Sequence, residues 1–169
     1  MELNEVIFKR RSIRKYKPGV AVADAQAEKL LRAAMAAPTA RNMQEWEFLV
    51  LRDRKNLDKL LAAHPYAGMV KEAPCAIIVC GNTKVDPIGY WPGDCSSALL
   101  NILLTATDMG LGSVWLGIHP RTDRVEAIKK VFNLPAHIMP LGVAVIGTAD
   151  EKKGPEDRYD VKKIHHEKW

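Results

Sequence analysis

Two short segments of this chain are apolar at every position, and they constrain its fold more than any other feature. Residues 76–80 read Ala-Ile-Ile-Val-Cys, and residues 141–147 read Leu-Gly-Val-Ala-Val-Ile-Gly. Runs of β-branched side chains without a polar face are typical of strands that carry helices on both sides of their sheet. We therefore expect each segment to be a strand inside a sheet, with residues 76–80 central.

The other periodic segments alternate between helical and strand spacing. Helical spacing occurs at 3–10, 24–37, 53–61, 94–110 and 122–132, and strand spacing at 46–51 and 113–116. Asp24, Asp53 and Asp94 stand where capping side chains are expected. The helix from Asp94 is apolar nearly all round, which predicts a buried central helix. The pattern indicates a layered α/β domain whose strand order cannot be read from spacing alone.

Length and composition favour one soluble domain over residues 1–169. A chain of 169 residues with 47% apolar residues can bury a substantial core. The longest apolar run, Cys75–Cys80, is far too short to span a bilayer, and Met1–Glu5 lacks the basic start of a signal peptide. We expect a cytoplasmic protein without membrane association.

The last twenty residues differ from the rest. From Asp150 the chain is polar, with only scattered Val161, Ile164 and Trp169 and no persistent period. Such a segment frays unless it docks on something. We expect the tail, about 150–169, to dock on another chain.

Cysteine and histidine patterns do not indicate a metal site or a hydrolase. Cys75, Cys80 and Cys95 form no C-x-x-C pair and have no histidine at ligand spacing, so they are interpreted as small buried hydrophobes. His119 is a lone histidine without an evident partner, and His165-His166-Glu167 lies in the polar tail. Nucleophile elbows, zinc helices and glycosidase carboxylate pairs are missing from the sequence. This favours chemistry carried by an organic cofactor.

The sharpest local motif is Arg10-Arg11-Ser12-Ile13-Arg14, at an expected helix-to-loop junction. Guanidinium forks and a hydroxyl match the oxygens of a phosphate group. A solvated basic turn, or a weak nucleic-acid patch, is the alternative interpretation of this motif alone.

Two further segments suit a flat ligand. Thr39, Asn42 and Gln44 offer donors and acceptors of the kind that match the edge of a heteroaromatic ring, although plain turn chemistry also uses these residues. Gly110-Leu111-Gly112 closes a helix before a strand, the reverse of a dinucleotide-binding fingerprint, so a Rossmann site is rejected. The glycines still permit close backbone approach after Trp115-Leu116.

Four segments in order carry a resemblance to a known family. They are R-R-S-I-R at 10–14, A-P-T-A-R-N-M-Q-E-W at 37–46, the run from G-D-C-S-S to V-W-L-G at 93–117, and V-I-G-T-A-D at 145–150. Over nearly its whole length the chain resembles the FMN-dependent nitroreductase family, in the compact branch of that family.

The resemblance implies an α+β fold, a nitroreductase-like sandwich around a mixed, mostly antiparallel sheet flanked by helices. It also implies an interlocked homodimer with one FMN in each of two interface sites. The implied activity is that of an FMN-dependent oxidoreductase with ping-pong hydride transfer. NAD(P)H would reduce FMN at N5, and a nitroaromatic, quinone or similar small-molecule acceptor would then take the electrons.

Site residues follow from the resemblance position by position. Arg10, Arg11, Ser12 and Arg14 would bind the phosphate of FMN, with a late basic residue, Arg158 or else Lys153. Pro38, Thr39 and Asn42 would approach the ring from the partner chain, and Trp115, Leu116 and Gly117 would offer backbone groups to it. No side chain is implied as an acid or base, and no metal is implied.

Departures from the family leave some points open. The frequent Q-P-W of the family reads Gln44-Glu45-Trp46 here, which we interpret as a change at the start of a strand. The variable region 65–92 holds Tyr66, Tyr90 and Trp91, which suit stacking on a planar acceptor. Reductive dehalogenation or dehydrogenation on the same cofactor is an alternative function. A non-enzymatic basic nucleic-acid-binding domain is a more distant one, and we expect no nucleic-acid partner.

Overall fold

The computed structural model describes all 169 residues, and its elements alternate along the chain as the spacing predicts. The elements are α1 (Leu3–Lys9), α2 (Asp24–Met35), η1 (Ala40–Asn42), β1 (Trp46–Leu51), α3 (Arg54–Ala63), η2 (Gly68–Lys71), β2 (Cys75–Asn82), α4 (Trp91–Asp108), β3 (Gly112–Gly117), α5 (Thr122–Phe132), β4 (Ile138–Gly147) and η3 (Val161–Lys163).

The four strands form one sheet in the order β1-β2-β4-β3. Each neighbouring pair is antiparallel, and a single parallel bridge joins Ser12 to Ser113 at the start of β3. The two fully apolar segments are therefore the two inner strands. The α+β sandwich is confirmed, with a four-stranded sheet that is antiparallel throughout within one chain.

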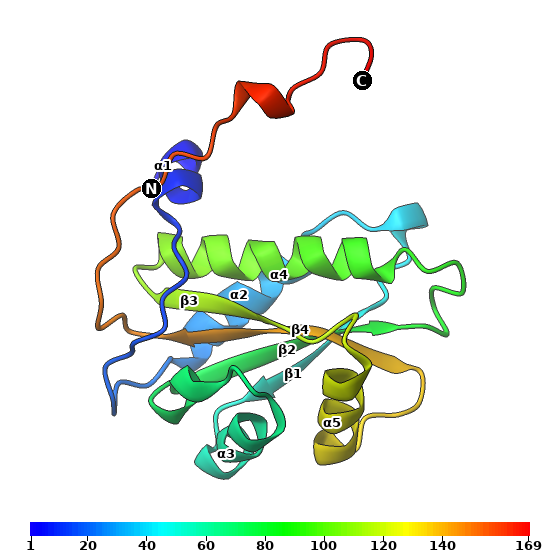
Figure 1. Cartoon of the computed structure of the whole chain (residues 1–169). Helices are drawn as coiled ribbons and strands as arrows, with labels where there is room; N and C mark the ends of the chain where they lie inside the picture. Colours follow the sequence, from blue (N-terminus) through cyan, green and yellow to red (C-terminus); the bar gives the residue numbers. More distant parts are fainter.

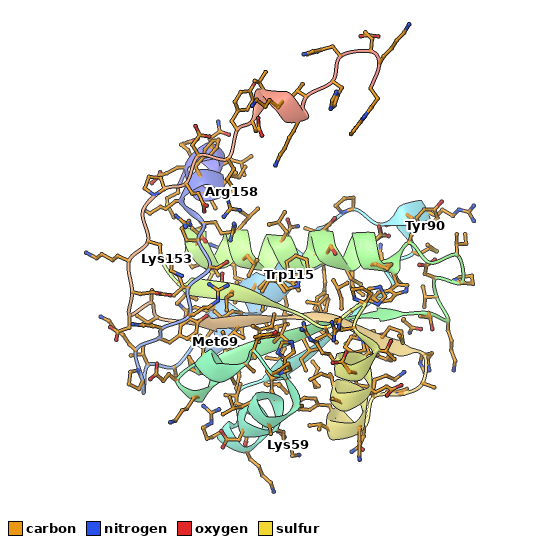
Figure 2. The ribbon with its side chains drawn as sticks, viewed as in Figure 1. Lys59, Met69, Tyr90, Trp115, Lys153 and Arg158 are labelled. Atoms are coloured by element: carbon orange, nitrogen blue, oxygen red, sulfur yellow. The ribbon has the colours of Figure 1, made fainter.

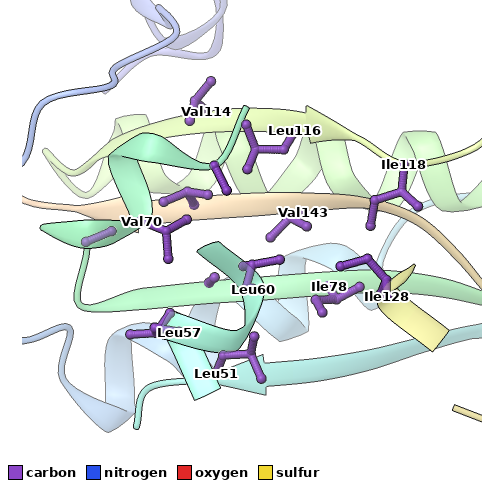
Figure 3. Close-up of a cluster of buried hydrophobic side chains, with 14 of the residues drawn as sticks. Leu51, Leu57, Leu60, Val70, Ile78, Val114, Leu116, Ile118, Ile128 and Val143 are labelled. Carbon is purple, nitrogen blue, oxygen red and sulfur yellow. The ribbon is translucent and has the colours of Figure 1, made fainter. Parts of the chain in front are cut away.

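Helices cover both faces of the sheet (Figure 1). α2 and α4 pack on one face, where Leu99 and Ile102 of α4 meet Ile77 and Ile146 of the inner strands. α3 and α5 cover the other face, where Leu60 and Ile128 pack on Ile78 and Val143 (Figure 3). The buried central helix predicted from its apolar surface is α4.

Of the three aspartates predicted to cap helices, only one does so, and the predictions for the other two are wrong. Asp53 caps α3 by accepting from the N–H groups of Lys55 and Asn56, as expected. Asp24 is instead the first residue of α2, and its carboxylate pairs with Arg52. Asp94 lies inside the first turn of α4, which begins at Trp91 because Asp86 accepts the Trp91 N–H at 2.7 Å.

The two ends of the chain lie outside the sandwich. Of the apolar residues of α1, only Val6 is buried, whereas Leu3, Ile7 and Phe8 are exposed. The C-terminal segment passes α1 and continues away from the body (Figure 1), and its residues from Lys152 onward are exposed. None of the helices is both long enough and apolar enough to cross a lipid bilayer.

The three cysteines are buried and unpaired, as interpreted from the sequence. Burial raises the pKa of Cys75 to about 11 and that of Cys80 to about 12. These thiols therefore stay protonated near neutral pH and act as core side chains.

Candidate functional site

The basic motif lies where the chain leaves α1 and bridges to the start of β3. Ile13 N–H donates to the carbonyl oxygen of Ser113 at 2.9 Å, which fixes the turn against the sheet. A hollow of about 220 Å³ opens beside it, and the six residues that line it are Arg10, Arg11, Ser12, Arg14, Lys153 and Arg158. All six are polar and five are cationic, so the hollow is suited to an anion.

The C-terminal segment is tied to this turn by three hydrogen bonds and by an ion pair between Glu156 and Arg11. Nζ of Lys153 donates to the carbonyl oxygen of Ser12 at 2.5 Å, and the backbone N–H of Arg14 donates to Glu151 at 2.5 Å. Arg11 donates to the carbonyl oxygen of Gly154. The Arg14 N–H, followed by the charge of Lys153, holds the pKa of Glu151 below its usual range although partial desolvation opposes this. Residues 150–154 are thereby part of the basic site.

Arg158 and Lys153 differ in how they reach the hollow. The Arg158 side chain is 71% exposed and pairs with Glu156 at 2.5 Å, and Glu156 also pairs with Arg11 at 3.1 Å. The Lys153 side chain is 28% exposed and contacts the turn directly. Figure 2 shows Lys153 beside the sandwich and Arg158 farther out, near α1. Of the two candidates for a late basic residue, the geometry favours Lys153.

The β3 residues lie along an edge of the sheet, next to the turn. The Leu116 side chain is buried in the core, so only its backbone can meet a ligand. Trp115 packs over Gly142, where a Cβ would lie 2.5 Å from the indole nitrogen. Around Gly117, by contrast, the space where a Cβ would stand is open to 4 Å. A flat group can therefore approach the backbone at Gly117.

Two side chains that sequence reasoning did not single out hold the Gly117 carbonyl. His64 Nε2 lies 3.0 Å from this oxygen, and Arg124 donates to it at 2.8 Å. The Tyr66 N–H donates to Nδ1 of His64, so Nε2 carries the proton. The Arg124 guanidinium also lies 5.1 Å from the centre of the Tyr66 ring. No sequence spacing links α3, β3 and α5, so only the fold could reveal this cluster.

The loop after α2 is held in an unusual conformation. Arg41, Asn42 and Gln44 have φ of 54°, 55° and 52°, which is uncommon for residues other than glycine. The Gln44 side chain donates to the Asn42 side chain at 2.9 Å, and the Gln44 N–H donates to Thr39 Oγ1 at 3.2 Å. Pro38 and Asn42 are exposed, and Thr39 is half-buried.

This loop and the basic turn sit at opposite ends of α4. The Ala40 N–H donates to Asp94 in the first turn of α4, whereas the N-terminal amine of the chain pairs with Asp108 in its last turn. A rise of about 1.5 Å per residue puts these two anchor points about 21 Å apart. The structure brings the basic turn and the start of β3 together within one chain and leaves Pro38, Thr39 and Asn42 apart from the turn.

Two other histidines, His119 and His165, have ordinary surroundings. His119 packs edge-on against Trp91, with ring centres 4.8 Å apart. His165 stacks on Trp169 within the exposed tail. Neither has the orienting partner that a general base needs.

The donor set fits a phosphate-bearing ligand. Arg10 and Arg14 have no ion-pair partner, and Ser12 is half-buried between them. The hydroxyl of Ser113, which is bridged to Ser12, is buried without a hydrogen-bond partner. Arg10, Ser12 and Arg14 and the open backbone at Gly117 therefore provide a phosphate end and a flat end for one elongated ligand.

Comparison with known proteins identifies the family. The model of the "Nitroreductase family" matches residues 7–77 and 61–148. The chain belongs to the nitroreductase family. The resemblance stated from the four motifs is thereby confirmed.

Relatives cover the whole chain. A protein of Methanothermobacter thermautotrophicus named "Putative NADH dehydrogenase/NAD(P)H nitroreductase" is 45% identical over all of this chain and 88% of its own length. A crystal structure from Parabacteroides distasonis with the same description has 43% identity and a TM-score of 0.95, covering 100% and 99% of the two chains. An "FMN-dependent Nitroreductase" from Clostridium difficile has 30% identity and a TM-score of 0.91, covering 98% and 99%.

Proposed function

We propose that this protein is an FMN-dependent oxidoreductase that passes hydride from NAD(P)H to a nitroaromatic, quinone or similar small acceptor in a ping-pong reaction. The observation that carries the proposal is the wholly polar, mostly cationic hollow that the Arg10–Arg14 turn forms near the start of β3, the strand whose other end has the open backbone at Gly117. Membership of the nitroreductase family, and the FMN dependence stated for the C. difficile relative, support it.

The basic turn would hold the phosphate of the cofactor. Arg10 and Arg14, which make no ion pairs, would supply charge-assisted hydrogen bonds, and Ser12 would add a hydroxyl. Lys153 already donates to the Ser12 carbonyl and would place a further ammonium at the same group. The Glu156 carboxylate, which bridges Arg11 and Arg158, would have to share those guanidiniums with the ligand.

The β3 edge would hold the ring. Bound FMN supplies the hydride chemistry, so the task of the protein is to position the ring and to stabilise the negative charge that develops on it. Arg124 and His64 would keep the Gly117 backbone fixed through its carbonyl, and Arg124 would add positive charge nearby. No side chain is assigned as an acid or base.

Completion of the site by a second copy of the chain is part of the proposal. Pro38, Thr39 and Asn42 lie at the far end of α4 from the basic turn, and the family resemblance implies that they approach the ring from a partner subunit. Exposed apolar side chains on α1, α4 and the tail support such a dimer; they are Leu3, Ile7, Phe8, Leu100, Val161, Ile164 and Trp169. Burial of this surface would favour association.

The absorption spectrum of the purified, untagged protein tests the proposed function. We expect a yellow protein whose released chromophore is FMN, near one per chain, and which bleaches when NADH or NADPH is added without oxygen. A colourless protein that takes up no added FMN would overturn the proposal, and the basic turn would then serve another anion.

Removal of the tail after Gly154 tests the dimer. The truncation keeps Glu151 and Lys153 at the basic turn but deletes Val161, Ile164 and Trp169. We expect the full chain to elute as a dimer and the truncated chain as a monomer in size-exclusion chromatography with light scattering. A truncated chain that still elutes as a dimer would show that the tail does not hold the subunits together.

A further inference from the structure

The loop from Thr39 to Gln44 needs outside support. Three of its last four residues, Arg41, Asn42 and Gln44, are non-glycine residues in the left-handed region. Such a conformation persists only where surrounding contacts impose it. The hydrogen bonds of Gln44 with Asn42 and Thr39 are internal to the loop, so they do not fix the loop relative to the rest of the fold.

Asp94 supplies the support at the start of the loop. Its Oδ2 accepts the Ala40 N–H at 2.6 Å, from the first turn of α4. At the other end, the Glu45 carbonyl accepts the Asn82 N–H at 2.8 Å and joins the loop to the sheet. The orientation of the Asp94 carboxylate therefore affects the whole loop.

Beside Asp94 lies a buried acid, Glu45. Only 1% of Glu45 is exposed, and neither of its carboxyl oxygens has a hydrogen-bond partner. The titratable groups that face it are Asp94 and Cys95 of α4 and Asp86 of the preceding loop, and none of them is cationic. Burial first, and then the neighbouring carboxylates, raise the pKa of Glu45 above its usual range. Burial without a cationic neighbour favours the protonated form of a carboxyl group, and the protonated form can act as a donor.

Asp86 cannot take the place of Asp94 as the acceptor. Its two oxygens accept the N–H groups of Ile88, Gly89 and Trp91. Burial opposes its charge, but these backbone donors outweigh burial and lower the pKa of Asp86. Asp94 is thus the neighbouring carboxylate left to accept a hydrogen bond from a protonated Glu45.

We propose that Glu45 is a positioning residue, which as a neutral acid donates toward Asp94 and keeps the Asp94 carboxylate aimed at the Ala40 N–H, so that the loop 39–44 stays in its ligand-contacting conformation. This proposal rests on the proposed function, because the loop is the part that would meet the cofactor of the partner subunit. Glu45 stands where the family frequently has proline. The proposal gives this residue a role in positioning the loop, in addition to its place just before β1.

The direction of the pH effect follows from the raised pKa. Glu45 stabilises the fold fully below its ordinary pKa, and this contribution is lost as the pH rises through the higher value of the folded state. An ionised Glu45 beside Asp94 would repel it and release the Ala40 N–H. The loop 39–44 should therefore become more mobile as the pH rises through the raised pKa of Glu45.

The test compares the wild type with Glu45→Gln, which keeps the shape and a donor but cannot ionise. One readout is the dissociation constant of FMN between pH 5 and 9. The other needs no cofactor: the rate at which trypsin cleaves the folded protein after Arg41, an exposed residue of the loop. The ratio of the wild-type rate to the variant rate at each pH cancels the pH dependence of trypsin itself.

We expect FMN affinity of the wild type to fall roughly tenfold and Arg41 cleavage to rise as Glu45 ionises, since a buried group then loses its partner. Glu45→Gln should show neither trend. The matched control is Glu47→Gln, an exposed carboxylate two residues along β1, which should follow the wild type. Glu45→Ala, which has no donor, should be cleaved faster than wild type at every pH.

Equal pH profiles for wild type and Glu45→Gln in both readouts would overturn the positioning role. The two proposals fail separately. If no variant binds FMN at any pH, the proposed function fails while the trypsin ratio still decides the role of Glu45. If FMN binds and the ratio does not change with pH, only the role of Glu45 fails.

Discussion

The two ends of α4 hold their candidate ligand groups in different ways. At the C-terminal end, the Arg10–Arg14 turn is built from charged side chains, and residues 150–154 bind across it from the far end of the sequence. At the N-terminal end, the Thr39–Gln44 loop has few charges and a strained backbone, and one carboxylate, Asp94, accepts a hydrogen bond from it. The difference indicates separate tasks. The Arg10–Arg14 turn provides affinity for an anion, and the Thr39–Gln44 loop provides a surface of defined shape that can lie against a flat ring.

The largest effect is expected at the basic end. Arg10→Ala combined with Arg14→Ala should weaken FMN binding by at least about 100-fold, since each hydrogen bond to a charged group contributes about 1.5–3 kcal/mol. Fluorescence quenching of FMN measures this. The matched control is Arg32→Ala with Arg121→Ala, which removes the same charge from exposed residues paired with Glu28 and Asp123. Equal affinity of the two double variants would rule out the phosphate role of the turn.

A substitution in β3, which runs between the two ends, is expected to have an intermediate effect on FMN affinity. A methyl group added at Gly117 meets open space, so Gly117→Ala should leave the melting curve unchanged but weaken FMN binding about tenfold if the ring lies there. Gly142→Ala instead places its Cβ 2.5 Å from the Trp115 indole nitrogen and 2.9 Å from the Leu116 carbonyl oxygen. It should destabilise the protein by about 1–3 kcal/mol. Thermal unfolding and FMN titration of both variants separate the two roles, and unchanged FMN binding by Gly117→Ala would move the ring away from β3.

The contrast between the ends also explains what could be predicted from the sequence. The core elements depend on local periodicity, so the inner strands and the buried α4 could be predicted, and the Arg10–Arg14 turn is contiguous enough to be recognised as a phosphate motif. The start of α4 was misplaced because Asp86, five residues before Trp91, caps it through loop geometry that spacing does not encode.

The interactions that could not be predicted join segments far apart in the chain. His64, which follows α3, and Arg124 of α5 meet at the Gly117 carbonyl oxygen. Asp94, 49 positions after Glu45, contributes to the raised pKa of Glu45. Sequence reasoning interpreted Glu45 only as the start of a strand, because burial of a single polar residue in an otherwise alternating segment leaves no periodic signal.

The smallest effect on FMN affinity is expected from a substitution of Glu156, and this substitution should strengthen binding rather than weaken it. Its carboxylate pairs with Arg11 at 3.1 Å and Arg158 at 2.5 Å, so it competes with a phosphate for both guanidiniums. Arg158, helped by Arg11, holds the pKa of Glu156 below its usual range against slight desolvation, so the competition is complete at neutral pH and is lost only as the pH falls through that lowered value.

Glu156→Gln should therefore bind FMN a few-fold more tightly at low ionic strength, and the gain should shrink in high salt, because exposed ion pairs are weak and screened. Glu151→Gln is the matched control, since Glu151 supports the turn by accepting the Arg14 N–H, and it should weaken binding. FMN titrations of both variants at two salt concentrations provide the measurement. If the two substitutions changed affinity in the same direction, binding would depend on the net charge of the basic end rather than on the arrangement of its side chains.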